Sequence, residues 1–259
     1  VQKEMSILFS DIRSFTTLSE SMTPEENFRF VNSYLSRMGP LVREHHGYID
    51  KYIGDAIMAL FDRSADDAVF TSVKMMEDLR EYNEGRLRAG YDPIYIGIGI
   101  NTGTMMFGTL GEAGRMEGSV ISDAVNLAAR LESLTKLYKT PMLISEATRN
   151  KLTPDTFQMR LIDKVAVKGK EEAVMIYEVL DAENTKERDA KLATLETFST
   201  GYELYQNQQF DKAQLQFQAC LKQTPKDRVA ELYVDRCKTL LSRGWDPETW
   251  DGIIRMDSK

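Results

Sequence analysis

The sequence predicts a mixed domain of strands and helices, α/β or α+β, followed by a small all-α appendage. Up to about residue 182, short β-rich runs alternate with stretches of helical periodicity. After about residue 196, only helical patterns continue. The chain has 259 residues, 42% of them hydrophobic, which is enough for one large domain or a medium domain with a smaller appendage.

The first two elements have clear start signals. The run MSILFSDI alternates between apolar and polar residues, and it predicts a strand that ends near Asp11. Thr23 as N-cap, Pro24 at the first helical position and Glu26 three residues after the cap form a capping-box pattern. This pattern predicts a helix that runs to about His46.

The next elements include a predicted central hairpin. In YIDKYIGDAIMALF, two strand-like runs flank Gly54 and Asp55, a dipeptide suited to a tight turn. The unbroken apolar run over residues 56–61 predicts a strand that is buried on both faces. Residues 65–88 then have a helical period, and IYIGIGINTGTMMFGTLG predicts two strands with glycines at the bends.

The last part of the first domain predicts one more helix and three strands. SDAVNLAARLESLTKLY predicts a helix with Leu127, Leu131 and Leu134 along one stripe. PMLIS predicts a short strand, which a helical turn follows, and FQMRLIDKVAVKG and AVMIYEVLD predict the final two strands. We therefore expect the first domain to cover residues 1–182.

The remaining residues differ from the first domain in composition. Residues 183–195 are highly charged and predict a linker or an exposed helix start. Over residues 196–259, Gly201, Phe217 and Pro225 occur at spacings that resemble part of one tetratricopeptide repeat. Because so short a repeat rarely stands alone, this tail is expected to pack on the first domain or on a partner. Its last residues hold both tryptophans and predict a docking strap.

Charge and composition exclude several classes of function. A net charge of -7 argues against a nucleic-acid partner, because affinity for phosphate backbones comes mainly from lysine and arginine. A small anionic substrate would therefore need metal ions. His45 and His46 are adjacent at a predicted helix end, which argues against histidine catalysis.

The cysteine count and the lack of a long apolar run indicate the setting. Cys220 and Cys237 form neither a disulfide framework nor a metal-ligand spacing, and no run is long enough to span a bilayer. We expect a cytoplasmic domain, with membrane attachment of a parent protein left open. Because the chain begins at Val1, we expect it to be a piece of a longer protein with an upstream sensor.

Two aspartates stand where a carboxylate needs a partner. Asp11 continues the strand face of Ile7 and Phe9, and Asp55 lies at the turn of the central hairpin. Buried carboxylates are costly unless they are paired or metal-bound, so the two could hold a pair of Mg²⁺ ions, with the Ile12 carbonyl as a further ligand. Alternatively, Asp11 caps the following turn and Asp55 only favours the hairpin.

Three further side chains are candidates for binding a phosphate or a ribose. Asn126 and Arg130 lie four residues apart, so both project from one face of the predicted helix. An amide and a guanidinium side by side can orient a ribose and bind a phosphoryl oxygen, although a solvated helix face would look the same. Lys168 in VKGK precedes a glycine bend, either as a phosphate ligand or as an ordinary turn lysine.

Taken together, these segments resemble a known family. ILFSDIRSFT, YIDKYIGDAIMALF, GINTG, SVISDAVNLAARLE and VAVKGK occur in this order and closely resemble the catalytic domain of class III nucleotide cyclases. The resemblance runs from about residue 1 to residue 180. It implies a ferredoxin-like α/β fold and a head-to-tail homodimer with sites at the interface.

The resemblance also implies a role for individual residues. Asp11 and Asp55, with the Ile12 carbonyl, would bind two Mg²⁺ or Mn²⁺ ions per site. Asn126 and Arg130 would stabilise the transition state. The residues implied to contact the triphosphate are Lys168 and the backbone around Phe15 and Thr16.

Two positions are implied to select the purine. Lys51 matches the purine-selecting lysine of adenylyl cyclases, and Ser119 matches the second position, where Asp or Thr is more familiar. Adenine offers an acceptor at N1 and a donor at N6, which suit an ammonium group and an accepting hydroxyl. Guanine reverses both edges, so ATP is favoured. Ser122 also departs from the family pattern, since glycine is common there, but serine can cap the helix.

Other functions are left open by the sequence. A guanylyl or dual-specificity cyclase would share most of these motifs. A catalytically silent cyclase-like module for dimerisation would be expected to lack a metal aspartate or Arg130, and this chain has them. The tail could also bind a partner as a secondary role.

Overall fold

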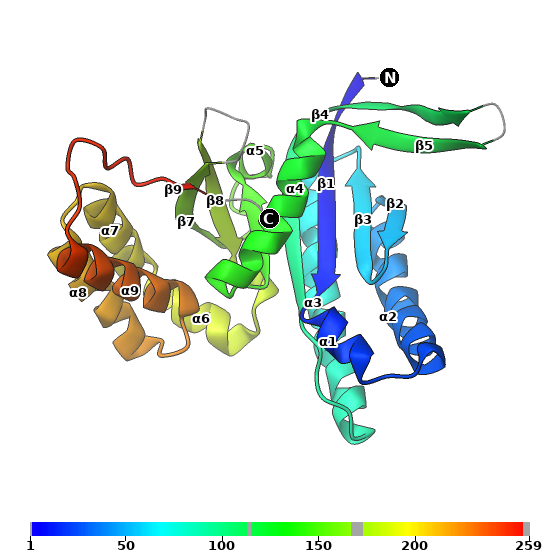
Figure 1. Ribbon diagram of the computed structural model, residues 1–259, viewed down its shortest axis with the longest axis horizontal. Helices are drawn as coiled ribbons and strands as arrows, with labels where there is room; N and C mark the ends of the chain where they lie inside the picture. Colours follow the sequence, from blue (N-terminus) through cyan, green and yellow to red (C-terminus); the bar gives the residue numbers. More distant parts are fainter. Residues whose placement is uncertain (1, 113–114, 167–172, 256–259) are drawn as a thin grey trace. The chain divides into compact units, whose positions relative to one another are not determined.

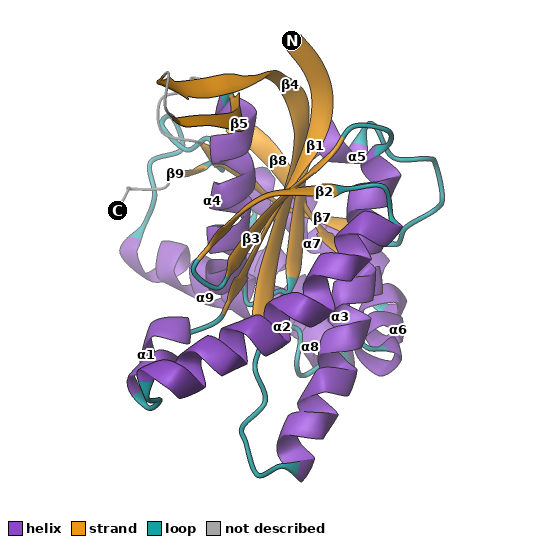
Figure 2. Ribbon diagram, turned by 90° about the vertical axis from the view of Figure 1, so that its right-hand side faces the viewer, coloured by secondary structure: helices purple, strands orange, loops and turns teal. Residues whose placement is uncertain are grey.

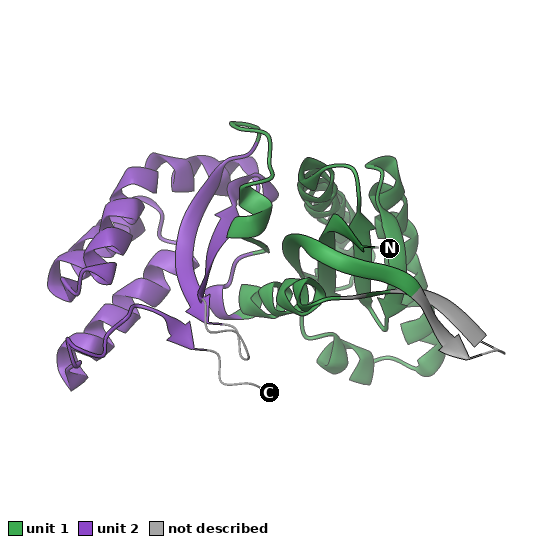
Figure 3. Ribbon diagram, turned by 90° about the horizontal axis from the view of Figure 1, so that it is seen from above, with its two compact units in different colours: residues 1–136, 141–156 green, residues 137–140, 157–259 purple. Residues whose placement is uncertain are grey.

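The computed structural model describes residues 2–112, 115–166 and 173–255, without the side chains of residues 109–112, 115–119 and 121. The chain forms two compact units, coloured separately in Figure 3. The first unit contains residues 1–136 and 141–156, and the second contains residues 137–140 and 157–259. None of the helices in the described parts of the chain is both long and apolar enough to cross a membrane.

The first unit is built on an antiparallel sheet with helices on both faces. Its elements in chain order are β1 (Gln2–Ile12), α1 (Phe15–Glu20), α2 (Pro24–Glu44), β2 (Tyr48–Ile53), β3 (Ala56–Phe61), α3 (Ala65–Arg88), β4 (Ile96–Glu112), β5 (Arg115–Ile121), α4 (Asp123–Tyr138), β6 (Met142–Ser145) and α5 (Glu146–Arg149) (Figure 1). The spatial order β2-β3-β1-β4, with α2 and α3 as crossovers, is the ferredoxin-like arrangement. This confirms the predicted α/β fold class.

Two helical layers enclose this sheet. Figure 2 shows α2 and α3 on one face of the strands and α4 on the other. The face under α2 and α3 is closed by buried apolar side chains, among them Tyr34 and Met75. The short strand β6 pairs in parallel with β4, and β5 pairs in antiparallel with the distal part of β4.

The predicted start of α2 is confirmed in detail. The Thr23 hydroxyl accepts a hydrogen bond from the Glu26 backbone N–H at 3.3 Å, and the Glu26 carboxylate accepts one from the Thr23 N–H at 2.8 Å. This reciprocal capping box satisfies two of the backbone donors that a helix start leaves without a partner. The helix ends at Glu44, close to the predicted end near His46.

The stretch IYIGIGINTGTMMFGTLG corrects one prediction. Its glycines were expected to mark bends between two strands, but β4 is a single strand of 17 residues. Gly97 and Gly99 serve close packing instead. A Cβ atom at Gly99 would lie 2.1 Å from the Glu132 backbone nitrogen and 2.5 Å from the Ala128 carbonyl oxygen. The backbone of α4 therefore lies directly on a strip of β4 that has no side chains.

Two elements of the first unit were not predicted. Helix α1 has only six residues, and its N-cap Ser14 makes no side-chain capping bond, so the sequence carries no start signal for it. Strand β5 follows β4 through a connection whose residues 113 and 114 lie outside the described part of the chain. Both elements depend on contacts with the rest of the unit rather than on local pattern.

The second unit combines the last strands of the expected first domain with the tail. Its elements are β7 (Met159–Ala166), β8 (Ala173–Val179), the 3-10 helix η1 (Leu180–Ala182), α6 (Thr185–Ala193), α7 (Leu195–Gln206), α8 (Phe210–Gln223), α9 (Arg228–Arg243) and β9 (Ile254–Arg255). Strand β7 pairs in antiparallel with β8 and in parallel with β9. The tail helices share a core of aromatic rings from Phe198, Tyr205, Phe210, Phe217 and Tyr233.

The C-terminal residues dock within this same unit. The Trp250 ring contacts the rings of Tyr205 and Phe210 at centroid distances of 5.3 and 5.0 Å, and the Trp245 ring contacts Phe210 at 4.7 Å. Strand β9 follows and pairs with β7. The predicted strap therefore binds the tail helices and β7 of its own chain. The resemblance of the tail to a tetratricopeptide repeat, and the domain border after residue 182, stay predictions.

The charged segment 183–195 contains helix α6 and one end of a buried ion cluster. The Lys191 ammonium contacts the Glu178 carboxylate at 2.6 Å, and Arg160 contacts the same carboxylate at 2.6 Å. Burial alone would raise the pKa of Glu178, but the charges of Arg160 and Lys191 lower it to about 2. This segment is therefore a packed helix rather than a free linker.

The close packing of the α4 backbone on Gly99 predicts the effect of adding one methyl group at this position. We expect Gly99→Ala to lower the free energy of unfolding by about 1 to 3 kcal/mol, because its Cβ would meet helix backbone that cannot rotate away. The measurement is urea unfolding followed by circular dichroism. Gly108→Ala on the same strand is the control, since its Cβ would meet no atom within 4 Å and should change stability by less than about 0.5 kcal/mol. Equal losses of stability for the two variants would contradict the close packing of α4 on Gly99.

Candidate active site

Two predicted metal ligands come together at one end of the sheet. Asp11 is the second-to-last residue of β1, and Asp55 follows the left-handed Gly54 in the β2–β3 turn. The antiparallel pairing of β1 with β3 places this turn beside the end of β1. The Asp55 carboxylate accepts a hydrogen bond from the Ile12 backbone N–H at 3.0 Å. Asp11, Ile12 and Asp55 thus form one group of oxygen-bearing residues.

The two carboxylates interact directly. Burial raises the pKa of Asp55 to about 7, and a hydrogen bond and the negative charge from Asp11 add to this rise. Asp55 is only 8% exposed, whereas the Asp11 side chain is 31% exposed and faces the ammonium group of Lys136 at 3.9 Å. Two adjacent carboxylates with so few neighbouring positive charges favour the uptake of a cation.

The donor set fits a hard divalent cation. Mg²⁺ is typically bound by one or two carboxylates together with substrate phosphates and water, rather than by a closed protein cage. Among the described residues, no group of three or more His, Cys, Asp or Glu side chains is arranged to hold a metal ion. Asp11 and Asp55, with the Ile12 carbonyl, therefore suit Mg²⁺ or Mn²⁺ whose remaining ligands come from a bound substrate.

The chain after Asp11 leads into helix α1. This helix begins after Ser14, which has a φ of 53° and makes no side-chain capping bond. Phe15 and Thr16 form the first turn of α1, and the Phe15 ring stacks on Phe30 at a centroid distance of 6.4 Å. The backbone near Phe15 thus follows Asp11, at the end of β1, by only a few residues.

Charged residues from α4 contact the same end of β1. Arg13 donates a hydrogen bond to the Glu132 carboxylate at 3.2 Å and another to the Thr135 hydroxyl. Burial lowers the pKa of Arg13, while the negative charges of Glu132 and Asp11 oppose this change. Through Arg13 and Lys136, helix α4 is tied directly to the strand that carries Asp11.

The start of α4 has its own anchors. The Ser122 hydroxyl accepts from the Ala124 N–H at 3.1 Å and donates to the Thr104 carbonyl at 2.8 Å, so this departure from the family pattern caps the helix as predicted. The buried Asn101 side chain donates to the Ala124 carbonyl at 3.0 Å. These three bonds fix the first turn of the helix that carries Asn126 and Arg130.

Asn126 and Arg130 project from one stretch of this anchored helix. Leu127, Leu131 and Leu134 are buried, as the sequence predicted, whereas Asn126 is exposed and Arg130 is partly exposed. The helix therefore separates an apolar stripe from the side that bears the amide and the guanidinium. Whether these two groups contact a substrate stays a prediction.

The predicted purine-selecting residues lie on two different strands. Lys51 is on β2 opposite Met58 of β3, and its side chain is 43% exposed with the ammonium group 3.1 Å from the Asp50 carboxylate. The backbone of Ser119 pairs with Gly108 in the β4–β5 ladder, but its side chain lies outside the described part of the structure. Lys168 also lies outside the described residues.

Several residues around the site were not predicted. They are Arg13, Tyr34, Glu132 and Lys136. Tyr34 is fully buried in α2, and burial, together with the charges of Asp55 and Asp11, raises the pKa of its hydroxyl. Tyr34 therefore stays protonated behind the carboxylates. Only Glu132 and Lys136 carried a signal, because they are spaced four residues apart on the helix that carries Arg130.

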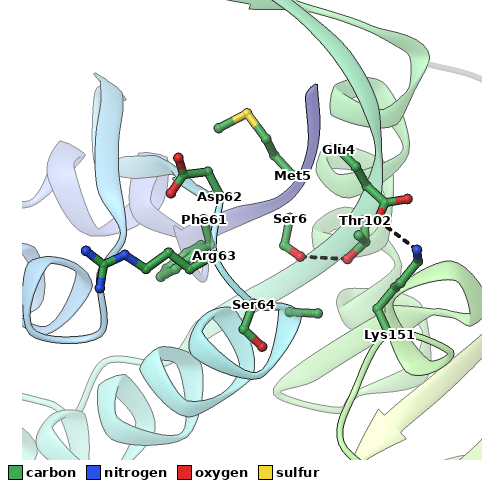
Figure 4. A pocket seen from close by; sticks show the side chains of 10 residues that line it. Glu4, Met5, Ser6, Phe61, Asp62, Arg63, Ser64, Thr102 and Lys151 are labelled. Atoms are coloured by element: carbon green, nitrogen blue, oxygen red, sulfur yellow. Dashed lines mark hydrogen bonds and ion pairs between the residues drawn. The ribbon is translucent and has the colours of Figure 1, made fainter. Parts of the chain in front are cut away.

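A polar cavity of about 170 Å³ lies elsewhere in the first unit. Figure 4 shows its lining, where the Ser6 and Thr102 hydroxyls are 2.7 Å apart and Lys151 pairs with Glu4. None of the predicted site residues lines it. Ser6 precedes Asp11 by five residues, or about 16 Å of extended strand, so this cavity is separate from the end of β1 that carries Asp11.

Comparison with known proteins identifies the family. Residues 1–180 match the family described as the adenylate and guanylate cyclase catalytic domain. The chain therefore belongs to this family, and the predicted resemblance to class III nucleotide cyclases is confirmed for these residues.

Two curated relatives are adenylate cyclases. The adenylate cyclase of Anabaena cylindrica is 50% identical over 184 residues, which cover 68% of this chain and 37% of that protein. The terminal-differentiation specific adenylate cyclase of Dictyostelium discoideum is 39% identical over 242 residues, which cover 91% of this chain and 11% of that protein. The chain thus spans only a minor part of both relatives. The second alignment also extends beyond residue 180, into the tail.

Solved structures of both cyclase types are similar to this chain. The adenylyl cyclase CyaB from P. aeruginosa has a TM-score of 0.64 and 33% identity, covering 71% of this chain and 97% of that chain. The guanylyl cyclase Cya2 has a TM-score of 0.63 and 33% identity, covering 71% of this chain and 95% of that chain. The fold is therefore shared by enzymes that differ in the base they accept.

The raised pKa of Asp55 predicts a pH-dependent stability in metal-free protein. The folded protein keeps a proton that the unfolded chain, with an aspartate pKa of about 3.9, releases. The stability that this proton contributes to the folded state is therefore fully present below about pH 4 and is lost as the pH rises through about 7. We expect Asp55→Asn to lose less stability than wild type between pH 5 and 8, as measured by urea unfolding in EDTA.

Two comparisons complete this experiment. Asp62→Asn is the control, because a hydrogen bond from Lys3 lowers the pKa of Asp62, so its charge does not change between pH 5 and 8. Adding Mg²⁺ at pH 8 should stabilise wild type but not Asp55→Asn, because a ligand stabilises only the state that binds it. Parallel pH profiles for wild type and Asp55→Asn would contradict the raised pKa of Asp55.

Proposed function

We propose that this chain is an adenylyl cyclase domain that converts ATP to 3′,5′-cyclic AMP and pyrophosphate. It would act with two Mg²⁺ or Mn²⁺ ions at each of two sites shared across a head-to-tail homodimer. The observation that carries the proposal is the pair of interacting carboxylates, Asp11 and Asp55, at the end of the sheet that α4 is tied to. The names of the two curated relatives support it.

The reaction is a displacement at phosphorus. The ribose 3′-oxygen attacks the α-phosphorus, the bond from that phosphorus to the β,γ-diphosphate breaks, and the hydroxyl proton leaves to solvent. Bound divalent ions would lower the pKa of the 3′-hydroxyl and offset phosphoryl charge. Asp11 and Asp55 would hold these ions, so no histidine is needed as a base.

The residues of α4 would act on the reacting groups. The Asn126 amide can orient the ribose, and the Arg130 guanidinium can take up charge on the α-phosphate in the transition state. A preorganised donor of this kind typically lowers the activation barrier by about 3 to 4 kcal/mol. Two features of α4 support this role, because such a donor must have a fixed position. Hydrogen bonds hold the first turn of the helix, and its backbone packs against Gly99.

The base would be read by Lys51 and Ser119. An ammonium group can donate to adenine N1, and a serine hydroxyl can accept from adenine N6. Guanine would place its N1–H donor against the ammonium, which leaves two buried donors without acceptors. Because a serine can donate as well as accept, selectivity against GTP should be looser than with an aspartate. Lys168 and the backbone near Phe15 and Thr16 would bind the triphosphate.

The homodimer is supported by exposed apolar side chains in two places. Tyr52 and Ile53 are exposed immediately before the turn that holds Asp55. Met106 and Phe107 are exposed on β4 beside the end of β5, where the register places Met106 opposite Gln2, at the other end of β1 from Asp11. A second copy could cover these side chains. In a head-to-tail dimer, Asp55 would bind metal in one site while Lys51 of the same chain reads adenine in the other.

A guanylyl cyclase is the second candidate function. It is favoured by the similarity of the solved guanylyl cyclase Cya2, which is as identical to this chain as the adenylyl cyclase CyaB is. The lysine at position 51 argues for ATP, because an ammonium group cannot accept the N1–H of guanine. A catalytically silent module is disfavoured by the presence of Asp11, Asp55 and Arg130 together.

The direct test is to identify the product. Purified protein is incubated with ATP or with GTP, in the presence of Mg²⁺ or Mn²⁺, and the products are measured by chromatography and mass spectrometry. Cyclic AMP should form from ATP faster than cyclic GMP forms from GTP. EDTA should abolish the reaction, because it removes the divalent ions that would offset the negative charge of the phosphoryl groups. A folded dimer that forms no cyclic nucleotide would rule out the proposal, and faster conversion of GTP would favour the second candidate.

The shared site predicts complementation between two inactive variants. Asp11→Ala and Arg130→Ala should each be nearly inactive, whereas a mixture that exchanges subunits should regain about a quarter of wild-type activity, since half of the dimers carry one intact site. Asp11→Ala mixed with Asp55→Ala is the control, because both changes affect the same half of the site and no dimer regains an intact one. Restoration in neither mixture, despite exchange shown by native mass spectrometry, would reject shared sites.

A further inference from the structure

Strand β2 has an irregularity immediately before Lys51. Ile49 pairs with Ala59 of β3. Lys51, two residues later, pairs with Met58, which is only one residue from Ala59. Asp50 is therefore an extra residue in β2, which makes this position a β-bulge. Strand β2 stands first in the strand order, next to β3 (Figure 1), and bulges are common at the edges of sheets.

The bulge determines the face of the sheet to which Lys51 points. Tyr48 pairs with Leu60 and packs with it and Met58 in one core cluster. Lys51 pairs with Met58, and residues that pair directly point to the same face. Tyr48 and Lys51 thus share a face although they are three residues apart. In a regular strand an odd separation places two side chains on opposite faces.

The opposite face of β2 packs on helix α2. A Cβ atom at Gly39 of α2 would lie 3.4 Å from the Ile49 side chain and 3.1 Å from the Tyr52 hydroxyl. If β2 were regular, Asp50 would pair with Met58, and Lys51 would point to this α2 face instead. The extra residue therefore turns Lys51 away from α2.

The bulge also brings the Asp50 carboxylate beside the Lys51 ammonium group. The Oδ2 atom of Asp50 and the Nζ atom of Lys51 are 3.1 Å apart. Adjacent residues of a regular strand point to opposite faces and would not pair in this way. The Asp50 side chain is 4% exposed, whereas the Lys51 side chain is 43% exposed. The pair thus has a buried negative end and an accessible positive end.

The Asp50 carboxylate is poorly compensated apart from this lysine. Its Oδ2 atom is buried and makes no aligned hydrogen bond with the residues that the structure describes. Burial and the negative charges of Asp62 and Asp50 raise the pKa of the neighbouring Tyr48 hydroxyl. A buried carboxylate in such a place is costly, and the ammonium group offsets part of that cost. Because solvent does not reach Oδ2, Asp50 would influence a bound base through Lys51.

We propose that Asp50 is a positioning residue, which fixes the Lys51 ammonium group for base recognition and so sets the preference of the site for ATP over GTP. This inference rests on the proposed function, in which Lys51 donates to adenine N1. It also gives the β-bulge a role, because the bulge is what places the two side chains on one face.

A lysine without such a partner would discriminate poorly between the two bases. Its ammonium group carries three donors at the end of a flexible four-carbon stem. Guanine has a donor at N1 but an acceptor at O6 beside it. A mobile ammonium group could avoid the N1–H and donate to O6, whereas one that Asp50 holds would meet N1. Fixing the lysine in advance also reduces the entropy lost when ATP binds.

The test compares kcat/KM for ATP with kcat/KM for GTP in the full chain. Asp50→Asn keeps the size of the side chain and removes its charge. It should lower the ATP-to-GTP ratio about tenfold, mainly through a higher KM for ATP, with kcat for ATP changed less than about twofold. Asp62→Asn is the matched control, because it removes a carboxylate that pairs with another lysine, Lys3, in the same unit. Its ratio should equal that of wild type.

A double-mutant cycle separates positioning from a general structural effect. Lys51→Met should lower the ratio at least as far as Asp50→Asn does. If Asp50 acts through Lys51, adding Asp50→Asn to Lys51→Met should change the ratio by less than about twofold. An effect that does not pass through Lys51 would lower the ratio by the same factor in both backgrounds.

Two features protect the test against misfolding. Both substrates are measured on the same preparation, so a partly unfolded sample does not change the ratio. Because Lys51 is half-exposed, its ammonium group can turn to solvent when the carboxylate is removed, and the variants should fold. Asp50→Ala repeats the comparison without a buried amide that would need partners of its own, and it should show the same fall in the ratio.

The outcomes separate this inference from the proposed function. If wild type prefers ATP and both Asp50→Asn and Asp50→Ala keep the ratio of the Asp62→Asn control, the positioning role is wrong. Equal factors in the two backgrounds of the cycle would overturn it as well. No cyclic nucleotide from folded wild type, or a wild-type preference for GTP, would instead overturn the proposed function, and the inference with it.

Discussion

The contact of the α4 backbone with Gly99 of β4 is the constraint on which the candidate site depends. Because Gly99 has no side chain, the helix lies closer to the strand than a Cβ would permit, and the side chains of Arg13 and Thr135 fill the space beside Gly97. At this distance Asn101 can reach the Ala124 carbonyl, and Glu132 can reach Arg13 near the carboxylates of Asp11 and Asp55. Backbone-to-backbone packing leaves little room for adjustment, so it suits a helix whose polar side chains must be held in place.

The end of β1 that carries Asp11 contains an unfavourable interaction between two carboxylates, which the same helix partly offsets. Burial disfavours the charged form of Asp55, and the neighbouring Asp11 carboxylate disfavours it further. Lys136 and Arg13 bring positive charge toward Asp11, but neither closes around the pair as a divalent ion would. A protein selected for stability alone would replace one carboxylate, so retention of both is more consistent with binding than with folding.

The elements that the sequence predicted are those with local signals. The capping box at Thr23, the hairpin at Gly54 and the leucine stripe of α4 each follow from residues within a few positions, and the Asp11–Asp55 pair follows from the cost of burying a carboxylate. The continuity of β4 was missed because a glycine has the same appearance at a bend and under a helix. Arg13 was missed because its partner Glu132 is distant in sequence. The roles of Lys51, Ser119 and Lys168 stay predictions that only the family resemblance supports.

The second unit follows a different logic, in which buried charges define geometry. Buried ion pairs are weak evidence for stability, because desolvation offsets most of their attraction. Their value here is geometric, since Arg160 and Arg236 bind β7 and α9 at two levels of the same helix. Two such pairs fix both the rotation of α9 and its position along β7, which apolar packing alone would leave looser. The β-bulge before Asp163 is consistent with this reading, because it places the second carboxylate where a regular strand would not.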